Sequence, residues 1–199
     1  MSGLFKPVRH GGAAITLDQV EASILRSFAV QMLELIGPGD EAADSDDPLA
    51  RLFATGPSKA PDDPALARLF PDAYGDGPDA AEGSEDLRTA EYSAEFRRFT
   101  ENDLRARKRE DGLALVRSLD QAPTGRRGRV ELTLDDEGCR HWLGALNDLR
   151  LTLGSRLQVT GDHDADPYVL ADEDPRKPLL MAFVWLGQLQ ESLLDALTR

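Results

Sequence analysis

Chemically reactive side chains are scarce in this 199-residue chain, which has one cysteine and three histidines. A single cysteine excludes an intrachain disulfide and any zinc site built from several cysteines, and it fits a reducing compartment. His10, His141 and His163 show no metal-ligand spacing. The phosphate-loop, dinucleotide-binding and G-x-S-x-G motifs are all missing. The sequence therefore predicts a protein that is not an enzyme, with no catalytic residues, no metal and no cofactor.

Long apolar runs are missing as well. No run approaches the roughly 20 residues that a membrane-spanning helix needs. The first ten residues, MSGLFKPVRH, lack the apolar core of a signal peptide. We therefore expect a cytoplasmic protein without a membrane contact.

Positive charge is outnumbered, with 23 lysines and arginines against 36 acidic residues and a net charge of −13. Residues 40–86 hold 13 acidic residues and only three basic ones, among many prolines and glycines. We therefore expect a single domain over residues 1–199 that carries an acidic Pro/Gly-rich insert or linker at 38–86. This charge argues against a domain that holds DNA mainly by neutralising phosphates. Direct DNA contact stays open, because a dimer could bring basic faces together.

Short strands and a helix are predicted at the amino-terminal end. Residues 4–10 and 13–17 read as two strands around the tight-turn pair Gly11-Gly12. A helix over residues 18–36 follows, with a wide apolar stripe that stops at Gly37-Pro38.

Two similar phrases lie in the acidic segment. DDPLARLF at residues 46–53 and DDPALARLF at residues 62–70 each predict one or two helical turns. In both, aspartate is a suitable cap and proline suits the first helical position.

The rest of the chain predicts three further helices and one strand. Helical periodicity runs over residues 84–119 and 176–197, and a strand at 130–134 leads into a helix that ends near residue 157. Thr133 is the expected cap of that helix, paired with Asp136. On the last helix we expect an inner face made of Leu180, Phe183, Val184, Gly187 and Leu194. The fold expected is α+β and mainly helical, with four long helices packed against a small antiparallel sheet.

Cys139 is the candidate for redox chemistry. A reactive thiol needs a lowered pKa, usually from a nearby cation or a helix amino terminus. Asp135, Asp136 and Glu137 would instead raise that pKa, and Cys139 lies three residues before Trp142 on the apolar face. A buried packing role is therefore favoured over a reactive one.

A run of charge on the helix at 84–119 is the candidate binding surface. Between residues 95 and 111 six basic residues alternate with five acidic ones, which is typical of an exposed, ion-paired helix. Arg98, Arg105 and Arg109 are spaced by seven and four residues and could share one face. We expect these arginines to contact a protein surface rather than phosphate groups, because the glycine-rich or aromatic residues that usually accompany a phosphate-binding patch are missing.

Arg150 falls between Leu146 and Leu153 at the edge of an apolar face. A guanidinium in that position usually extends its head to water or pairs with a carboxylate. We expect a structural clamp, with Asp103 or Glu101 as its partner.

The acidic loop at residues 161–175 matches part of a calcium-binding loop. Asp162, Asp164, Asp166 and Glu173 fall at ligand positions, but Pro167 stands where the motif requires glycine for its sharp turn. A solvated acidic loop is therefore the favoured interpretation.

Five segments together carry a resemblance to a known family. They are FKPVRHGGAAITL, DPALARLFPDAY, EFRRFTENDLRARKRE, GCRHWLGALNDLRLTLGSRL and LMAFVWLGQLQESLLDAL. In order and wording the chain resembles the actinobacterial oxidative-stress regulator family, AosR. The resemblance implies a small regulatory protein that responds to redox state and acts through partners in transcription. Redox sensing in that family is associated with a cysteine pair, so a disulfide switch here would have to be intermolecular.

Two functional hypotheses follow. The first is a non-enzymatic, redox-responsive regulator that contacts a transcription component, such as a sigma factor. The second is a scaffold or adaptor protein with no redox role. The sequence leaves the oligomeric state open, and a homodimer is compatible with it.

Overall fold

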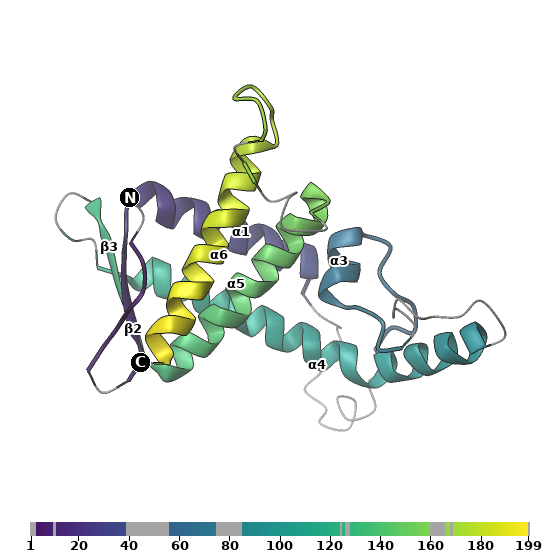
Figure 1. The fold of residues 1–199 in the computed structure, drawn as a ribbon. Coiled ribbons are helices and arrows are strands. Elements are labelled where there is room, and N and C mark those ends of the chain that lie inside the picture. The colour runs from purple at the N-terminus through teal and green to yellow at the C-terminus, as the bar shows by residue number, and fades with distance from the viewer. Residues whose placement is uncertain are drawn as a thin grey trace.

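The computed structural model describes residues 3–9, 11–38, 56–74, 85–123, 125, 128–159, 166–167 and 169–198. Within these residues the chain forms four long helices, one short helix and a three-stranded antiparallel sheet. The predicted mainly helical α+β fold is therefore confirmed. Figure 1 shows the sheet at one end of the molecule, while α4 extends far beyond the other helices at the opposite end.

The elements follow the predicted order along the chain. They are β1 (Lys6–Pro7), β2 (Ala13–Leu17), α1 (Gln19–Ile36), α3 (Pro64–Leu69), α4 (Glu85–Gln121), β3 (Val130–Leu134), α5 (Asp136–Leu157) and α6 (Lys177–Leu197). The second of the two similar phrases forms α3, with Asp63 as its cap. The first phrase, at residues 46–53, lies outside the described residues, as does most of the 38–86 segment.

The sheet has the order β1-β2-β3, so β2 is central and β1, with its proline, lies at an edge. Gly11 and Gly12 form the turn before β2 with φ angles of 98° and 89°. A Cβ atom on Gly12 would lie only 2.0 Å from the carbonyl oxygen of Leu134. The turn can therefore approach β3 closely because both residues are glycine.

The bounds of α1 agree with those predicted, whereas the cap predicted for α5 is corrected. At α1, Asp18 and Glu21 form a complete capping box. At α5 the predicted Thr133 cap is wrong, because β3 continues past it to Leu134. Asp135 is the cap instead, and it accepts a hydrogen bond from the Gly138 amide at 2.8 Å.

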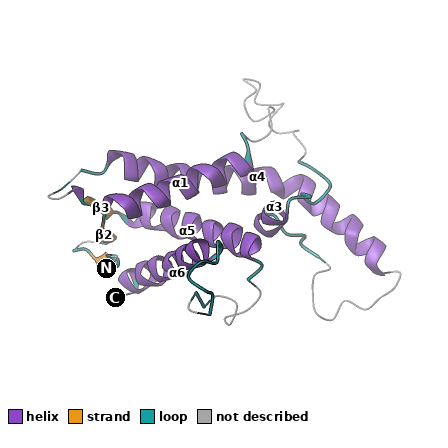
Figure 2. Cartoon of the chain, turned by 90° about the horizontal axis from the view of Figure 1, so that it is seen from above, coloured by secondary structure: helices purple, strands orange, loops and turns teal. Residues whose placement is uncertain are grey.

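Helix α5 is the centre of the packing. It contacts α3, α4 and α6, and α1 packs mainly on α4. Seen from above in Figure 2, α5 lies between the α1–α4 pair and α6. Trp142 of α5 is buried, meets the Phe5 ring edge-on at 5.6 Å, and donates to the Ser118 hydroxyl at 2.9 Å. This one side chain thus joins the amino-terminal strand segment, α4 and α5.

The predicted inner face of α6 is largely wrong. Of the predicted residues only Leu180 is buried, and Leu194 is exposed. The buried residues are Leu180, Leu186, Leu189, Ser192, Leu193 and Ala196. Because α6 carries apolar side chains around most of its circumference, hydrophobic periodicity did not distinguish the two faces.

Candidate functional site

The amino-terminal half of α4 buries polar side chains and exposes aromatic ones. Ser93, Arg97 and Glu101 are spaced by four residues and are all at least 96% buried. On the opposite face of the helix, Tyr92 and Phe99 are 54% and 67% exposed. With 3.6 residues per turn, the two sets point in nearly opposite directions. This is the reverse of the usual amphipathic helix, which buries its apolar side.

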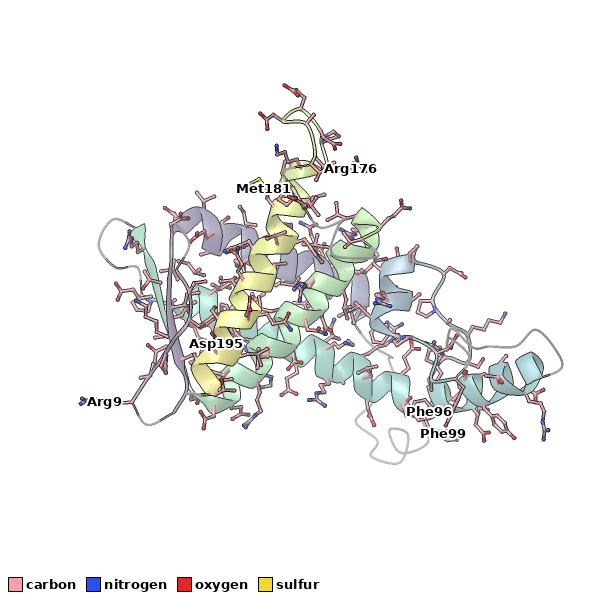
Figure 3. All side chains as sticks on the ribbon, viewed as in Figure 1. Arg9, Phe96, Phe99, Arg176, Met181 and Asp195 are labelled. Carbon is pink, nitrogen blue, oxygen red and sulfur yellow. The ribbon has the colours of Figure 1, made fainter. Side chains whose placement is uncertain are left out.

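We use the name aromatic stripe for Tyr74, Tyr92, Phe96 and Phe99. The Tyr74 ring contacts Tyr92 and Phe96 edge-on, at 6.5 Å and 6.1 Å between ring centroids. Its backbone is fixed to α4, because the Tyr74 amide donates to the Ser93 hydroxyl and that hydroxyl lies 2.9 Å from the Tyr74 carbonyl oxygen. Figure 3 places Phe96 and Phe99 along the edge of α4 that, in this view, faces away from α3. The stripe is therefore ordered and open to solvent.

A buried ionic cluster supports the stripe from the inner face of α4. Arg97 forms an ion pair with Glu101 and donates to the Phe70 carbonyl at 3.0 Å and to Asp72 at 2.8 Å. Arg105 pairs with Glu101 at 2.7 Å and lies over the Phe70 ring. The sequence predicted the ion pairing but placed it on an exposed helix. The location differs because α3 and the loop after it cover this face, a long-range contact that local periodicity does not report.

The three arginines predicted to bind a partner do not form one exposed face. Arg98 is exposed. Arg105 donates to the Ile36 carbonyl at 2.9 Å, and Arg109 donates to the Gly37 carbonyl. These two side chains bind the carbonyl groups at the carboxyl end of α1, which otherwise lack partners. Arg98 is therefore the member of the set that is exposed, although it lies on a different face of α4 from the aromatic stripe.

Cys139 is buried at the start of α5 and has no exposed surface. Its Sγ lies 3.9 Å from the Leu134 carbonyl oxygen. Burial raises the pKa of the thiol, and the nearby carboxylates of Asp136 and Asp135 raise it further. The structure therefore places a protonated, shielded thiol here, as the sequence favoured.

Arg150 connects α5 to α6. It donates to the Gln190 side chain at 2.9 Å, and its guanidinium lies 5.2 Å from the centre of the Phe183 ring. The partners expected from the sequence are wrong, since Glu101 pairs with other arginines within α4. The reason is geometric, because Arg150 faces α6.

Two further ionic contacts between α4 and α5 were not predicted. Lys108 pairs with Asp148 at 2.6 Å, and His141 contacts Asp111 at 2.7 Å. Burial raises the pKa of Asp148, and the Lys108 ammonium partly offsets that rise.

The part of the chain that the structure describes holds no group of three or more side chains suited to a metal ion. Asp162 and Asp164 of the acidic loop lie outside that part.

The aromatic stripe was not predicted from the sequence. Tyr92, Phe96 and Phe99 recur at spacings of four and three, which is a helical face. A second periodic set, Ser93, Arg97 and Glu101, lies on a separate side of the same helix, and this is the signal in the sequence that could have indicated two distinct faces.

These features define a small, mainly helical protein with an exposed aromatic surface on its longest helix. The chain belongs to the family of the domain of unknown function DUF2017, whose profile matches residues 1–197. It is similar to the protein named oxidative stress regulator AosR of Mycobacterium bovis and of Mycobacterium tuberculosis. The identity to each is 34% over 181 residues, which covers 87% of this chain and 76% of the relative. No solved structure matches the chain significantly. Among the described helices, none is both long enough and apolar enough to cross a membrane.

Proposed function

We propose that this chain is a non-enzymatic regulatory protein that binds a protein component of transcription, such as a sigma factor, through the aromatic stripe of α4. The similarity to a protein named an oxidative stress regulator supports the regulatory part of this proposal. The exposed aromatic stripe is the observation that carries the binding part.

The physical argument rests on what exposed aromatic rings do. Tyrosine and phenylalanine bury large areas on binding and are enriched at the centres of protein interfaces. Contiguous apolar surface is uncommon on a monomer and usually marks an interaction site. The contacts of Tyr74 with Tyr92 and Phe96 hold the rings in place before binding, which lowers the entropy lost on association.

Arg98 is the exposed charged residue on the same turns of α4, on a neighbouring face of the helix. Its guanidinium can donate to a partner carboxylate at the rim of the interface. Reversing the charge of Arg98 is expected to weaken capture less than a substitution in the stripe itself. The reason is that charges at the rim of an interface mainly change the association rate constant and change the dissociation constant less.

The direct test is affinity capture of the tagged full-length protein from its native host, followed by mass spectrometry. The test variant is Phe99→Asp, which places a charge on the stripe. The matched control is Val20→Asp, because Val20 is 66% exposed on α1. We expect a transcription component to be captured by the wild type and by Val20→Asp but lost with Phe99→Asp. Capture that is unchanged by Phe99→Asp would remove the stripe from the proposal.

A second candidate, a redox-independent adaptor, is favoured by one observation. Cys139, the only thiol, is fully buried, so an intermolecular disulfide would require local unfolding. We expect a maleimide to label the folded protein at least ~100-fold more slowly than the unfolded protein, because a protonated and shielded thiol reacts little. Capture that is identical with and without a thiol oxidant, and identical for Cys139→Ser, would support the adaptor. Partner binding that appears only on oxidation and needs Cys139 would support the redox-responsive regulator.

A further inference from the structure

Helices α3, α5 and α6 enclose a groove of about 790 Å³ on a different part of the molecule from the aromatic stripe. Three arginines line it, Arg68, Arg97 and Arg150, against a single carboxylate, Asp72. We call it the arginine groove. In a chain with a net charge of −13, a lining with this excess of positive charge is unusual.

Arg150 is the partly buried cation of this set that has no ion pair among the described residues. Its hydrogen-bond partner is the neutral amide of Gln190. Its Nε is buried without an acceptor. A partly buried cation without an anion is costly, so a bound anion would relieve that cost.

Arg97 also lines the groove. Its side chain is 96% buried and its charge is balanced by Glu101 and Asp72, yet its Nε also lacks an acceptor. Arg68 is exposed in the last turn of α3, so it can move toward a ligand. The groove is therefore lined by two cations that form no ion pair among the described residues, the partly buried Arg150 and the exposed Arg68, and by Arg97, whose charge is already balanced.

The remaining lining is mostly apolar, with a few neutral polar groups. Its apolar side chains include Phe70, Pro71, Leu151, Val159 and Phe183. Gln158 also lines the groove, and its left-handed φ of 56° is that of the residue that caps the carboxyl end of α5. The volume falls within the range of about 300–1,000 Å³ that is usual for small-molecule sites.

We propose that the arginine groove binds a small molecule that carries an oxyanion, a carboxylate or a phosphate, on an apolar body. The anion pairs with the guanidinium of Arg150, and Arg68 closes over it from α3. The apolar body lies against Phe70, Leu151 and Phe183. This inference does not rest on the proposed function, because the groove and the aromatic stripe share no residue.

The test is a titration of the full-length protein, followed through the arginine Nε–H signals in ¹⁵N NMR spectra. The probes are benzoate and phenyl phosphate, with acetate and inorganic phosphate as their counterparts without an apolar body, all at constant ionic strength. We expect a saturable shift of the Arg150 signal, with tighter binding of at least one aromatic probe than of its counterpart. Preference for benzoate would identify a carboxylate ligand, and preference for phenyl phosphate a phosphate ligand.

Variants separate the site from general charge effects. Arg150→Gln is expected to weaken binding by about tenfold or more, since a charge-assisted contact is lost. Arg156→Gln is the control, because Arg156 is exposed on the same helix and does not line the groove. Arg150→Lys, which keeps the charge without the planar fork, is expected to bind at an intermediate level. The proposal is overturned if no probe gives a saturable shift at Arg150 up to ~10 mM, a concentration at which even a weak site with a millimolar Kd would be largely filled. Equal binding by wild type and either Arg150 variant would overturn it too.

Discussion

Single residues show how this protein uses charge in its interior. Arg97 and Glu101 are almost fully buried, and each has more than one polar partner. Such a cluster adds little net stability compared with apolar side chains, but losing one member leaves an unpaired buried charge. The cluster fixes how the loop after α3 lies on α4, and that loop carries Tyr74 of the aromatic stripe.

Removal of Arg97 is predicted to be strongly destabilising. Arg97→Ala removes one hydrogen-bond donor from Glu101 and one from the Phe70 carbonyl. We therefore expect the free energy of unfolding to fall by about 3–5 kcal/mol. The neighbouring Arg98→Ala is the control and is expected to change it by less than about 0.5 kcal/mol, because Arg98 is exposed. Urea unfolding of both variants measures the difference. Equal effects would show that the ionic cluster does not hold the fold together.

The pH behaviour of buried Asp148 is predicted to differ from that of partly exposed Asp174. Burial raises the pKa of Asp148 above its ordinary value, whereas hydrogen bonds from Arg176 lower the pKa of Asp174 to about 2. A raised carboxyl pKa means that the folded state binds the proton more tightly. The Asp148 contribution to stability therefore falls as pH rises from the ordinary value through the raised one. For Asp174 the sign is opposite, and its contribution is lost as pH falls toward 2.

Carboxyl ¹³C NMR titration of the folded protein tests this pair directly. We expect Asp148 to titrate above 3.8, its ordinary value, and Asp174 near 2. Lys108→Met should raise the Asp148 midpoint further, since the ammonium that opposes the rise is removed. An Asp148 midpoint at or below 3.8 would mean that water reaches this carboxylate.

The bounds of a helix or strand could be predicted from the sequence where residues close by in the chain determine them. Helix α1 begins at its Asp18 capping box and ends before Gly37, and both ends were predicted. The elements whose exposed face depends on distant contacts could not be read in the same way. The inner face of α4 is decided by Phe70 and Asp72, which are more than 20 residues away along the chain.

For the candidate site residues, too, the features that depend on nearby residues could be predicted, and those that depend on distant contacts could not. The burial of Cys139 could be predicted, because its apolar neighbours lie on its own helix. The binding roles of Arg105 and Arg109 could not be judged, because their acceptors are carbonyl groups at the end of α1. The unpaired state of Arg150 likewise depends on how α6 packs on α5.

The hairpin turn is predicted to require glycine for a steric reason. An alanine at Gly12 would combine a strained positive φ with a Cβ atom 2.0 Å from the Leu134 carbonyl oxygen. At Gly37 the φ is also positive, but no atom lies within 4 Å of an added Cβ. We expect Gly37→Ala to cost about 1–3 kcal/mol from backbone strain, and Gly12→Ala to cost about 1–3 kcal/mol more from overpacking. Thermal unfolding of the two variants gives the comparison, and an equal loss would indicate that β3 moves aside at little cost.

On the scale of the whole molecule, the two proposed surfaces have different relations to the core. The arginine groove lies over α5, the central helix, on which both α3 and α6 pack. Figure 3 places Phe96 and Phe99 of the aromatic stripe on the part of α4 that reaches beyond the other helices. A partner can therefore contact the stripe without disturbing the packing around Trp142.

The measurement that tests the central claim most directly is site-specific photo-crosslinking in the living native host. A photoreactive phenylalanine analogue is placed at Phe99, and in a matched strain at Val20, since both side chains are exposed. We predict that position 99 crosslinks to one transcription protein, while position 20 does not. Crosslinks to that same protein from position 20 but not from position 99 would contradict the claim that the aromatic stripe of α4 binds the partner, as would the absence of any crosslink from position 99.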